Sequence, residues 1–262
     1  MHVLRSVATR TYWVKIRTAF TLVEALVSIA MIALLVGILV PVLGQVRNHS
    51  HEVASAVNLR SIGQIFEMYL DGSRGMYPAP VPGVAYPDPD PRLGSTVMGH
   101  WQATTFWPNL FYKQYPWNEN RQMFLAPGAV RDFESRFTAV TVIPASYSYS
   151  ASFLGQPRIW SGEIIPDTDW QSLERSVTQQ MVRYPSGKAL LWDVEMPYLR
   201  RPLERDNYQN LLEKTPVLFA DQHIEDRVPA EANPGVTNWA PYASHAHPYL
   251  HNTRDGVYGR DY

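Results

Sequence analysis

The chain begins with a long apolar segment that follows a polar and basic stretch. Residues 25–43 contain no Asp, Glu, Lys or Arg, and Leu, Ile, Val, Ala and Met dominate them. A helix rises about 1.5 Å per residue, so roughly 20 apolar residues cross a hydrocarbon core of about 30 Å. The segment is therefore predicted to be a membrane-spanning helix.

Apolar residues continue beyond Pro41, now close to the 3.6-residue period of an amphipathic helix. Pro41 is expected to kink the helix without ending it, because neighbouring groups can absorb the lost hydrogen bond. Asp71 and Gly72 are typical of a helix end. The pattern predicts a single helix of about 50 residues, which is unusually long for a globular chain. Its second part is expected to bury Val46, Val53, Val57, Ile62, Ile65, Phe66 and Tyr69.

Residues 76–262 show a different pattern. They are rich in Pro, Tyr and Trp and contain short apolar runs bounded by turn residues, which is typical of strands. We predict an α+β fold in which an antiparallel sheet packs on the amphipathic part of the long helix. The expected strands are 137–143, 146–153, 189–194 and 216–220, and a short helix capped by Asp169 is expected at 170–176.

The charges around the apolar segment are one-sided. Residues 1–23 contain Arg5, Arg10, Lys15 and Arg17 but no acidic residue, which predicts a cytoplasmic N-terminus. Glu24 then stands alone at the entrance of the apolar run. A carboxylate at mid-membrane costs about 2.5–3.5 kcal/mol, and somewhat less near the interface. An ordinary secretory signal cleaved near residues 42–44 is the alternative, but its apolar region is normally shorter, about 7–15 residues.

The hexapeptide 19–24 (AFTLVE) resembles the type III signal of prepilins and pseudopilins, whose usual form is Gly-Phe-Thr-Leu-x-Glu. The resemblance implies that a prepilin peptidase cuts between Ala19 and Phe20 and that Phe20 becomes the N-methylated first residue. It makes Glu24 the acidic residue at the fifth position of the mature chain, and Pro41 matches a proline common in the family. Ala19 departs from the usual Gly before the cut.

The same resemblance implies an organisation and a set of partners. It divides the chain into a leader (1–19), a transmembrane half of the helix (20–43), an amphipathic half (44–75) and a head (76–262), in a pilin-like fold. The expected location is a single pass through the inner membrane with a periplasmic head, or an extracytoplasmic filament. The expected partners are other copies, related pilin-like subunits, the prepilin peptidase and the assembly platform of a type II secretion system or type IV pilus.

Glu24 is expected to act between subunits. The cationic amine of Phe20 in a neighbouring subunit would relieve the cost of burying its carboxylate. Such a pair would set the register between subunits during assembly. A merely tolerated interfacial glutamate is the alternative.

A second, local resemblance lies in residues 216–224 (PVLFADQHI). They are similar to a Val-Leu-Phe-Ala-Asp-Gly-His-Val strand found in large pilin-like families of planctomycetes and related bacteria. Gln222 replaces the Gly of that strand, and Leu211 stands where those families have a signature His. The resemblance implies a shared strand.

The C-terminal region contains residue types that bind metals. His245, His247 and His251 form a His-x-His-x3-His pattern near Asp255, although tail histidines are often simply exposed. No cofactor is expected, and calcium is an alternative that comes from the resemblance alone, because some secretion pseudopilins hold calcium through carboxylates in their C-terminal loops. The carboxylates that it makes candidates are Asp221, Asp226, Asp255 and Asp261.

The composition reduces the number of function classes that fit the chain. A net charge of −1 and the lack of a basic cluster with interleaved aromatics disfavour nucleic-acid binding. The chain has no cysteine, so its stability depends on packing rather than disulfides. Two hypotheses remain: a non-enzymatic filament subunit, and a membrane-tethered binding or hydrolytic domain that uses the helix only as an anchor. The aromatic residues that serve either core packing or a glycan platform are Trp101, Trp107, Tyr112, Tyr115 and Trp117.

Overall fold

The apolar run and the segment after it form one helix, α1, at Leu22–Gly72. It passes through Pro41 without a break and ends at the predicted Asp71–Gly72 signal, so both predictions are confirmed. The kink at Pro41 stays a prediction. α1 contributes to both of the compact units into which the chain divides, Met1–Val46 and Arg47–Tyr262.

The structure is a computed structural model. It describes residues 21–87, 95–129, 145–163, 165–166, 169–196, 212–236 and 249–262. The predicted strand at 137–143 lies outside these residues.

In the first unit, α1 exposes its apolar side chains. The large apolar residues from Leu22 to Leu43 are exposed by between 44% (Val27) and 82% (Leu22). Among the described residues, α1 is the one helix long and apolar enough to cross a membrane, judged by length and composition. A signal sequence near an N-terminus has the same properties.

In the second unit, α1 buries a narrow stripe of residues three or four positions apart. These are Ser55, Leu59, Ile62, Gly63, Ile65, Phe66 and Leu70. The predicted stripe was partly wrong, because Val46, Val53 and Val57 are half or more exposed. Residues 46, 53 and 57 lie on another face of the helix from 55, 59, 62 and 66, since residues of one face are three or four positions apart.

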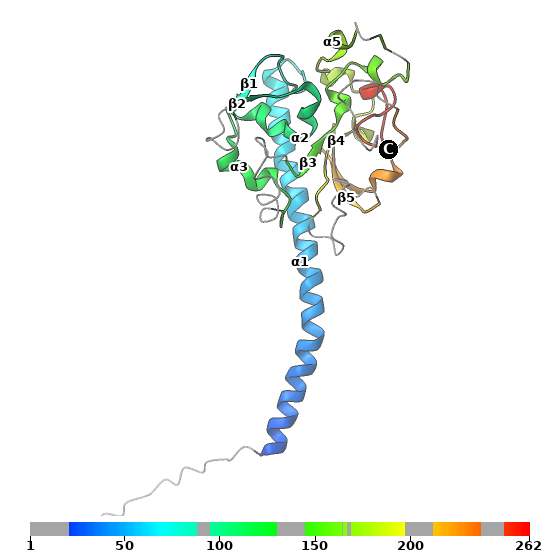
Figure 1. Cartoon of the computed structure of the whole chain (residues 1–262). Helices are drawn as coiled ribbons and strands as arrows, with labels where there is room; N and C mark the ends of the chain where they lie inside the picture. The colour runs from blue at the N-terminus through cyan, green and yellow to red at the C-terminus, as the bar shows by residue number, and fades with distance from the viewer. Residues whose placement is uncertain are drawn as a thin grey trace, which may run out of the picture. The chain divides into compact units, whose positions relative to one another are not determined.

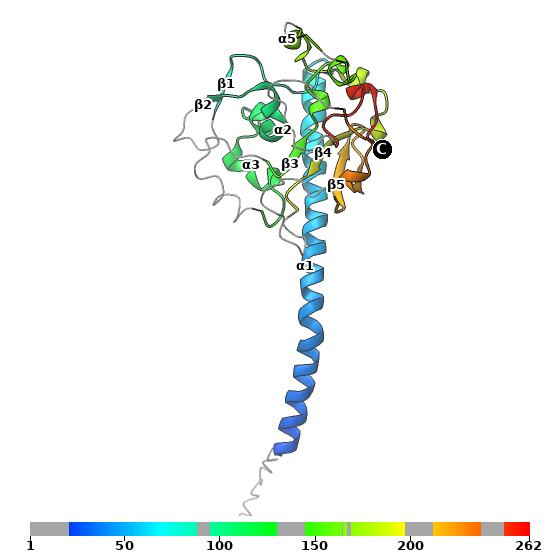
Figure 2. The same ribbon diagram turned by 45° about the vertical axis from the view of Figure 1, so that its right-hand side comes forward.

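A four-stranded antiparallel sheet forms the centre of the second unit, with the order β3-β4-β5-β6. Figures 1 and 2 show β3 and β4 passing beside the C-terminal part of α1. The α+β prediction is confirmed at this level. The strands are β3 (Tyr147–Tyr149), β4 (Ala189–Asp193), β5 (Thr215–Phe219) and β6 (Ile224–Arg227).

Both faces of this sheet are covered. Leu190, Leu191 and Leu218 join the core that contains the buried residues of α1. Trp192, Val217 and Phe219 pack on the opposite face with Leu250 and, at its edge, Tyr262. Every residue of β4 and β5 is buried as a result, which explains why these strands appear in the sequence as continuous apolar runs.

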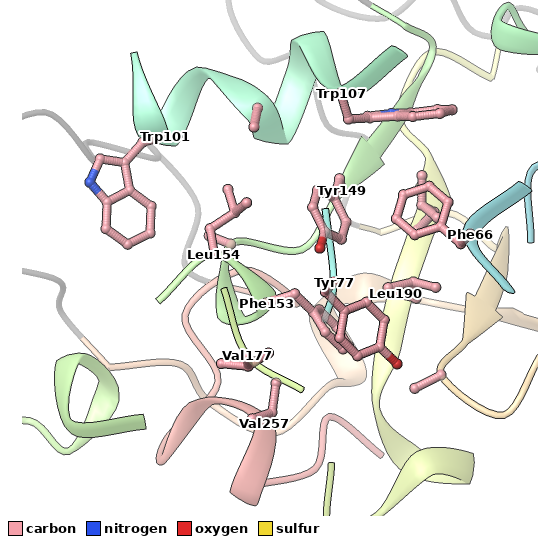
Figure 3. Packing of buried hydrophobic residues seen from close by; sticks show 14 of the residues in the cluster. Phe66, Tyr77, Trp101, Trp107, Tyr149, Phe153, Leu154, Val177, Leu190 and Val257 are labelled. Carbon is pink, nitrogen blue, oxygen red and sulfur yellow. The ribbon is translucent and has the colours of Figure 1, made fainter. Parts of the chain in front are cut away.

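The α1 side of the core is dominated by aromatic rings. Phe66 lies 5.6 Å from Trp107, 5.2 Å from Phe111 and 5.2 Å from Tyr149, measured between ring centroids. Figure 3 shows Phe66, Trp107, Tyr149 and Phe153 in this cluster. Trp101 and Trp107 are buried, and Tyr112, Tyr115 and Trp117 pack against the same core. The core-packing interpretation of these aromatics is therefore confirmed.

Short elements complete the unit. The predicted strands at 189–194 and 216–220 match β4 and β5 to within a residue. The predicted strand at 146–153 contains β3, followed by a 3-10 helix at Ala151–Phe153.

Asp169 precedes the predicted short helix, but its side chain makes no capping hydrogen bond. Among the described residues, the other strands and α-helices are β1 (Ala85–Pro87), which pairs with β2 (Ser95–Val97), and α2 (Ala103–Phe106), α3 (Trp117–Phe124) and α5 (Trp170–Leu173).

Candidate functional site

The first turn of α1 is organised by Thr21 and Glu24. The backbone N–H and Oγ1 of Thr21 both donate to Oε2 of Glu24, each at 2.8 Å. The backbone N–H of Glu24 donates back to Oγ1 of Thr21 at 3.2 Å. This reciprocal arrangement is a capping box, which satisfies N–H groups that the first turn leaves without helical partners.

The capping box adds a local role for Glu24. Glu24 accepts two hydrogen bonds from Thr21, so its carboxylate has neutral donors within its own chain as well as the cationic partner expected from another subunit. The sequence contains the signal for this contact, since Thr-x-x-Glu before an apolar run is typical of a capping box. Both bonds use Oε2, and within the described part of the chain Oε1 accepts none. Ala19 and Phe20 lie outside the described residues.

Ser28 also satisfies its polar group inside the helix. Its Oγ donates to the carbonyl oxygen of Glu24 at 2.7 Å. A hydroxyl bonded to the carbonyl four residues earlier needs no water, so it is tolerated in an apolar environment. Ser28 is thus a polar residue without a charge, and Glu24 is the single charged side chain between Leu22 and Leu43.

The second part of α1 is fixed to the sheet by a buried polar network. Ser55 Oγ donates to Oδ2 of Asp193 at 2.7 Å and lies 3.2 Å from the hydroxyl of Tyr147. The other oxygen, Oδ1, accepts the backbone N–H groups of Glu195 and Met196, each at 3.0 Å. Burial and the nearby charge of Asp193 raise the pKa of Tyr147, so its hydroxyl stays protonated. Sequence reasoning missed this network, because its members lie far apart along the chain.

The turn between β5 and β6 makes a second contact with α1. Gln222 adopts a φ of 71°, a left-handed conformation, and its Nε2 donates to Oε1 of Glu67 at 2.9 Å. Gly63 makes this approach possible, since a Cβ there would lie 2.2 Å from Oε1 of Gln222. Gln222 thus occupies a conformation that suits the Gly of the resembled strand, and its side chain reaches the helix.

Of the four candidate metal ligands, the structure describes His251 and Asp255. His245 and His247 lie outside the described residues. His251 is buried and stacks edge-on against Trp192, whereas Asp255 is exposed in a turn with a φ of 62°. Among the described residues, no group of three or more His, Asp or Glu side chains is arranged to hold a metal ion.

The carboxylates considered for calcium also have separate surroundings. Asp261 is buried and pairs with Lys188, with 3.1 Å between Oδ2 and Nζ. Asp221 contacts its neighbour His223, with 2.5 Å between Oδ1 and Nδ1. Burial, together with the charge of Glu52, raises the pKa of Asp226 on the edge strand β6. Calcium stays an alternative that comes from the resemblance alone.

A buried serine–histidine contact bears on the hydrolytic alternative. Nε2 of His251 lies 3.2 Å from Ser148 Oγ, and the backbone N–H of Ala151 donates to Nδ1 at 3.3 Å. An Nδ1 that accepts a hydrogen bond places the proton of the neutral ring on Nε2. Nε2 then donates to Ser148, which is the opposite of what a general base requires. This contact therefore supports packing rather than nucleophile activation.

A surface groove of about 840 Å³ lies beside α1 in the second unit. Its size falls within the range of small-ligand pockets, about 300–1,000 Å³. Arg47 and His51 supply its charged or ionisable groups. It is the candidate surface for the binding alternative. The lining residues are Arg47, His51, Asn58, Ser61, Gln122, Met123, Leu125, Ala126, Pro127 and Gly128.

Comparisons of the chain with protein-family models, with curated proteins and with solved structures find no match.

Proposed function

We propose that this chain is a pilin-like subunit that works by polymerisation. A prepilin peptidase cuts it between Ala19 and Phe20, α1 holds it in the inner membrane, and α1 then packs with other subunits. The product is a type II secretion pseudopilus or a type IV pilus-like filament. The observation that carries the proposal is the exposed apolar first part of α1, with Glu24 as its one charge.

The exposed surface is too large to be left in water. Each large apolar side chain contributes about 1.5–3 kcal/mol when it is fully buried. Covering several of those between Leu22 and Leu43 would therefore outweigh the whole stability of a typical domain, about 5–15 kcal/mol. This region needs a bilayer or the helices of other subunits around it.

Glu24 makes a plain membrane anchor a poor explanation. A carboxylate costs about 2.5–3.5 kcal/mol at mid-membrane and less near the interface, and a plain anchor gains only a helix cap from it. The capping box accounts for one oxygen of Glu24, and Gln can also complete such a box. The negative charge is therefore the feature that needs a partner, and the amine of Phe20 in a neighbouring subunit supplies one.

The N-terminus of the purified protein tests this proposal. Mass spectrometry of the full chain from its native membrane should find a mature chain that begins with N-methylated Phe20. An intact Met1, or a chain that begins at Gln45, would contradict the proposal. The first result would favour an uncleaved anchor, and the second an ordinary secretory signal.

A further inference from the structure

A lysine and an aspartate are buried in contact near the C-terminus. Lys188 immediately precedes β4, and Asp261 is the penultimate residue. Their side chains are 0% and 1% exposed. Nζ of Lys188 lies 3.1 Å from Oδ2 and 3.4 Å from Oδ1 of Asp261. The amine therefore faces both oxygens of the carboxyl group at hydrogen-bonding distance.

The two carboxyl oxygens have different partners. Oδ2 accepts the backbone N–H of Ala189 at 2.9 Å. Oδ1 accepts the hydroxyl of Thr253 at 2.5 Å, and the same hydroxyl accepts a hydrogen bond from Nζ of Lys188. Thr253 thus bridges the amine and one oxygen, while a backbone donor holds the other oxygen.

The surroundings disfavour charge. Phe153 lies against the pair, with its ring centroid 5.9 Å from Nζ. Burial lowers the pKa of Lys188, although the charge of Asp261 opposes this effect. An ion pair taken out of water loses the solvation of both charges, whereas an amide has no charge to solvate. A neutral amine is also the form of lysine that acts as a nucleophile.

We propose that Lys188 and Asp261 are joined by an intramolecular amide bond between Nζ and Cγ. A proton passes from the ammonium to the carboxylate, and the neutral amine attacks Cγ. The N–H of Ala189 stabilises the negative charge that develops on Oδ2. The hydroxyl of Thr253 carries a proton from Nζ to Oδ1, which leaves as water. The ammonium and carboxylate thus become one amide and one water molecule, with no oxidant or cofactor.

The bond would lock residue 261 onto the sheet. It would join the start of β4 to Asp261 and close a loop over residues 188–261. A covalent link across so long a loop restricts the unfolded chain in the way a disulfide does, and this chain has no cysteine. The proposal concerns the second unit alone and does not depend on the proposed filament function.

Trypsin digestion of the full-length protein provides the test. Trypsin does not cut after an acylated lysine, but it does cut after Arg183, Arg200 and Arg260. The expected product is peptide 184–200 with the dipeptide 261–262 attached, lighter than the two separate peptides by one water molecule. Fragmentation should locate the branch at Lys188. Free peptides 184–188 and 189–200 in place of the branched product would overturn the proposal.

Two variants show which groups form the bond. Lys188→Arg keeps a cation beside Asp261, but a guanidinium is not a nucleophile, so the branched product should be absent. Asp261→Ala removes the carboxyl group and should also abolish it. A residue-261 peptide still attached to the 184–200 region in either variant would overturn the assignment to Nζ and Cγ. Because the wild-type digest already decides between the amide and an ion pair, the test holds even where a variant folds poorly.

Discussion

The two parts of α1 share one helical backbone but face different surroundings. Between Leu22 and Leu43 the helix is almost entirely apolar and exposed. Between Ser55 and Leu70 it carries charged and polar residues, yet one narrow stripe is buried in an aromatic core. Judged by hydrophobicity alone, the first part would be buried in the protein and the second exposed, which is the opposite of what the structure shows.

This difference separates two kinds of contact. The buried stripe around Phe66 has its partners within the chain. Aromatic rings pack against Phe66, and Ser55 donates a hydrogen bond to Asp193. The first part of α1 has only its own capping box and the Ser28 bond among the described contacts. Substitutions in the second part should therefore change the stability of the head, and those in the first part should change association with membrane or other subunits.

Phe66→Ala should show the largest effect on stability. It removes a ring that contacts Trp107, Phe111 and Tyr149, and truncation of a buried Phe costs about 3–5 kcal/mol. Urea unfolding followed by tryptophan fluorescence measures the change. A loss below about 1 kcal/mol, the level of an ordinary substitution, would contradict the assigned packing.

Gly63→Ala should come next, with a net cost of up to about 2 kcal/mol, because overpacking costs about 1–3 kcal/mol and the better helix propensity of Ala offsets about 1 kcal/mol of it. Its Cβ would lie 2.2 Å from Oε1 of Gln222 and 3.2 Å from a methyl group of Leu218. Gln222→Gly removes the first clash and suits the left-handed φ of residue 222. The double variant should therefore be more stable than the sum of the single changes, as measured by a double-mutant cycle. Strict additivity would show that the turn does not contact the helix.

Ser55→Ala should destabilise the second unit by about 1–2 kcal/mol, because Oδ2 of the buried Asp193 loses a donor. Ser61→Ala is the matched control on the same helix. Ser61 bonds only the carbonyl of Val57 within α1, at a partly exposed position. Chemical denaturation of both variants gives the comparison. Equal losses would mean that the Ser55–Asp193 bond does not help hold α1 to the sheet.

Val57→Ala should have the smallest effect. Val57 is 58% exposed, and substitutions at such positions usually change stability by less than about 0.5 kcal/mol. The measurement is the same unfolding curve as for Phe66→Ala. A loss of more than 1 kcal/mol, larger than the usual surface effect, would place Val57 in the buried stripe after all.

The sequence predicted what depends on local pattern. The continuous apolar run predicted the first part of α1, and Asp71 and Gly72 predicted its end. Strands β4 and β5 were predicted because both of their faces are buried, which leaves unbroken apolar runs. β6 was missed because its residues, IEDR, are mostly charged, as is common for an edge strand.

The contacts that needed tertiary structure could not be predicted. Val53 and Val57 are as apolar as Ile62, and only packing decides which face of α1 the sheet covers. Ser55 and Asp193 are separated by 138 positions, and neither residue type indicates the other. The candidate site differs in this respect, because the Thr21–Glu24 capping box is a local motif that could have been predicted.

The proposed assembly of subunits depends most directly on the charge of Glu24. Glu24→Gln keeps the capping box, since Gln also serves at that position, but removes the negative charge. Membrane fractionation and electron microscopy of cells that express this variant compare insertion with assembly. We predict normal membrane insertion, an unchanged head and no filament or pseudopilus. Normal filaments from Glu24→Gln would contradict pairing between Glu24 and the amine of Phe20 in a neighbouring subunit.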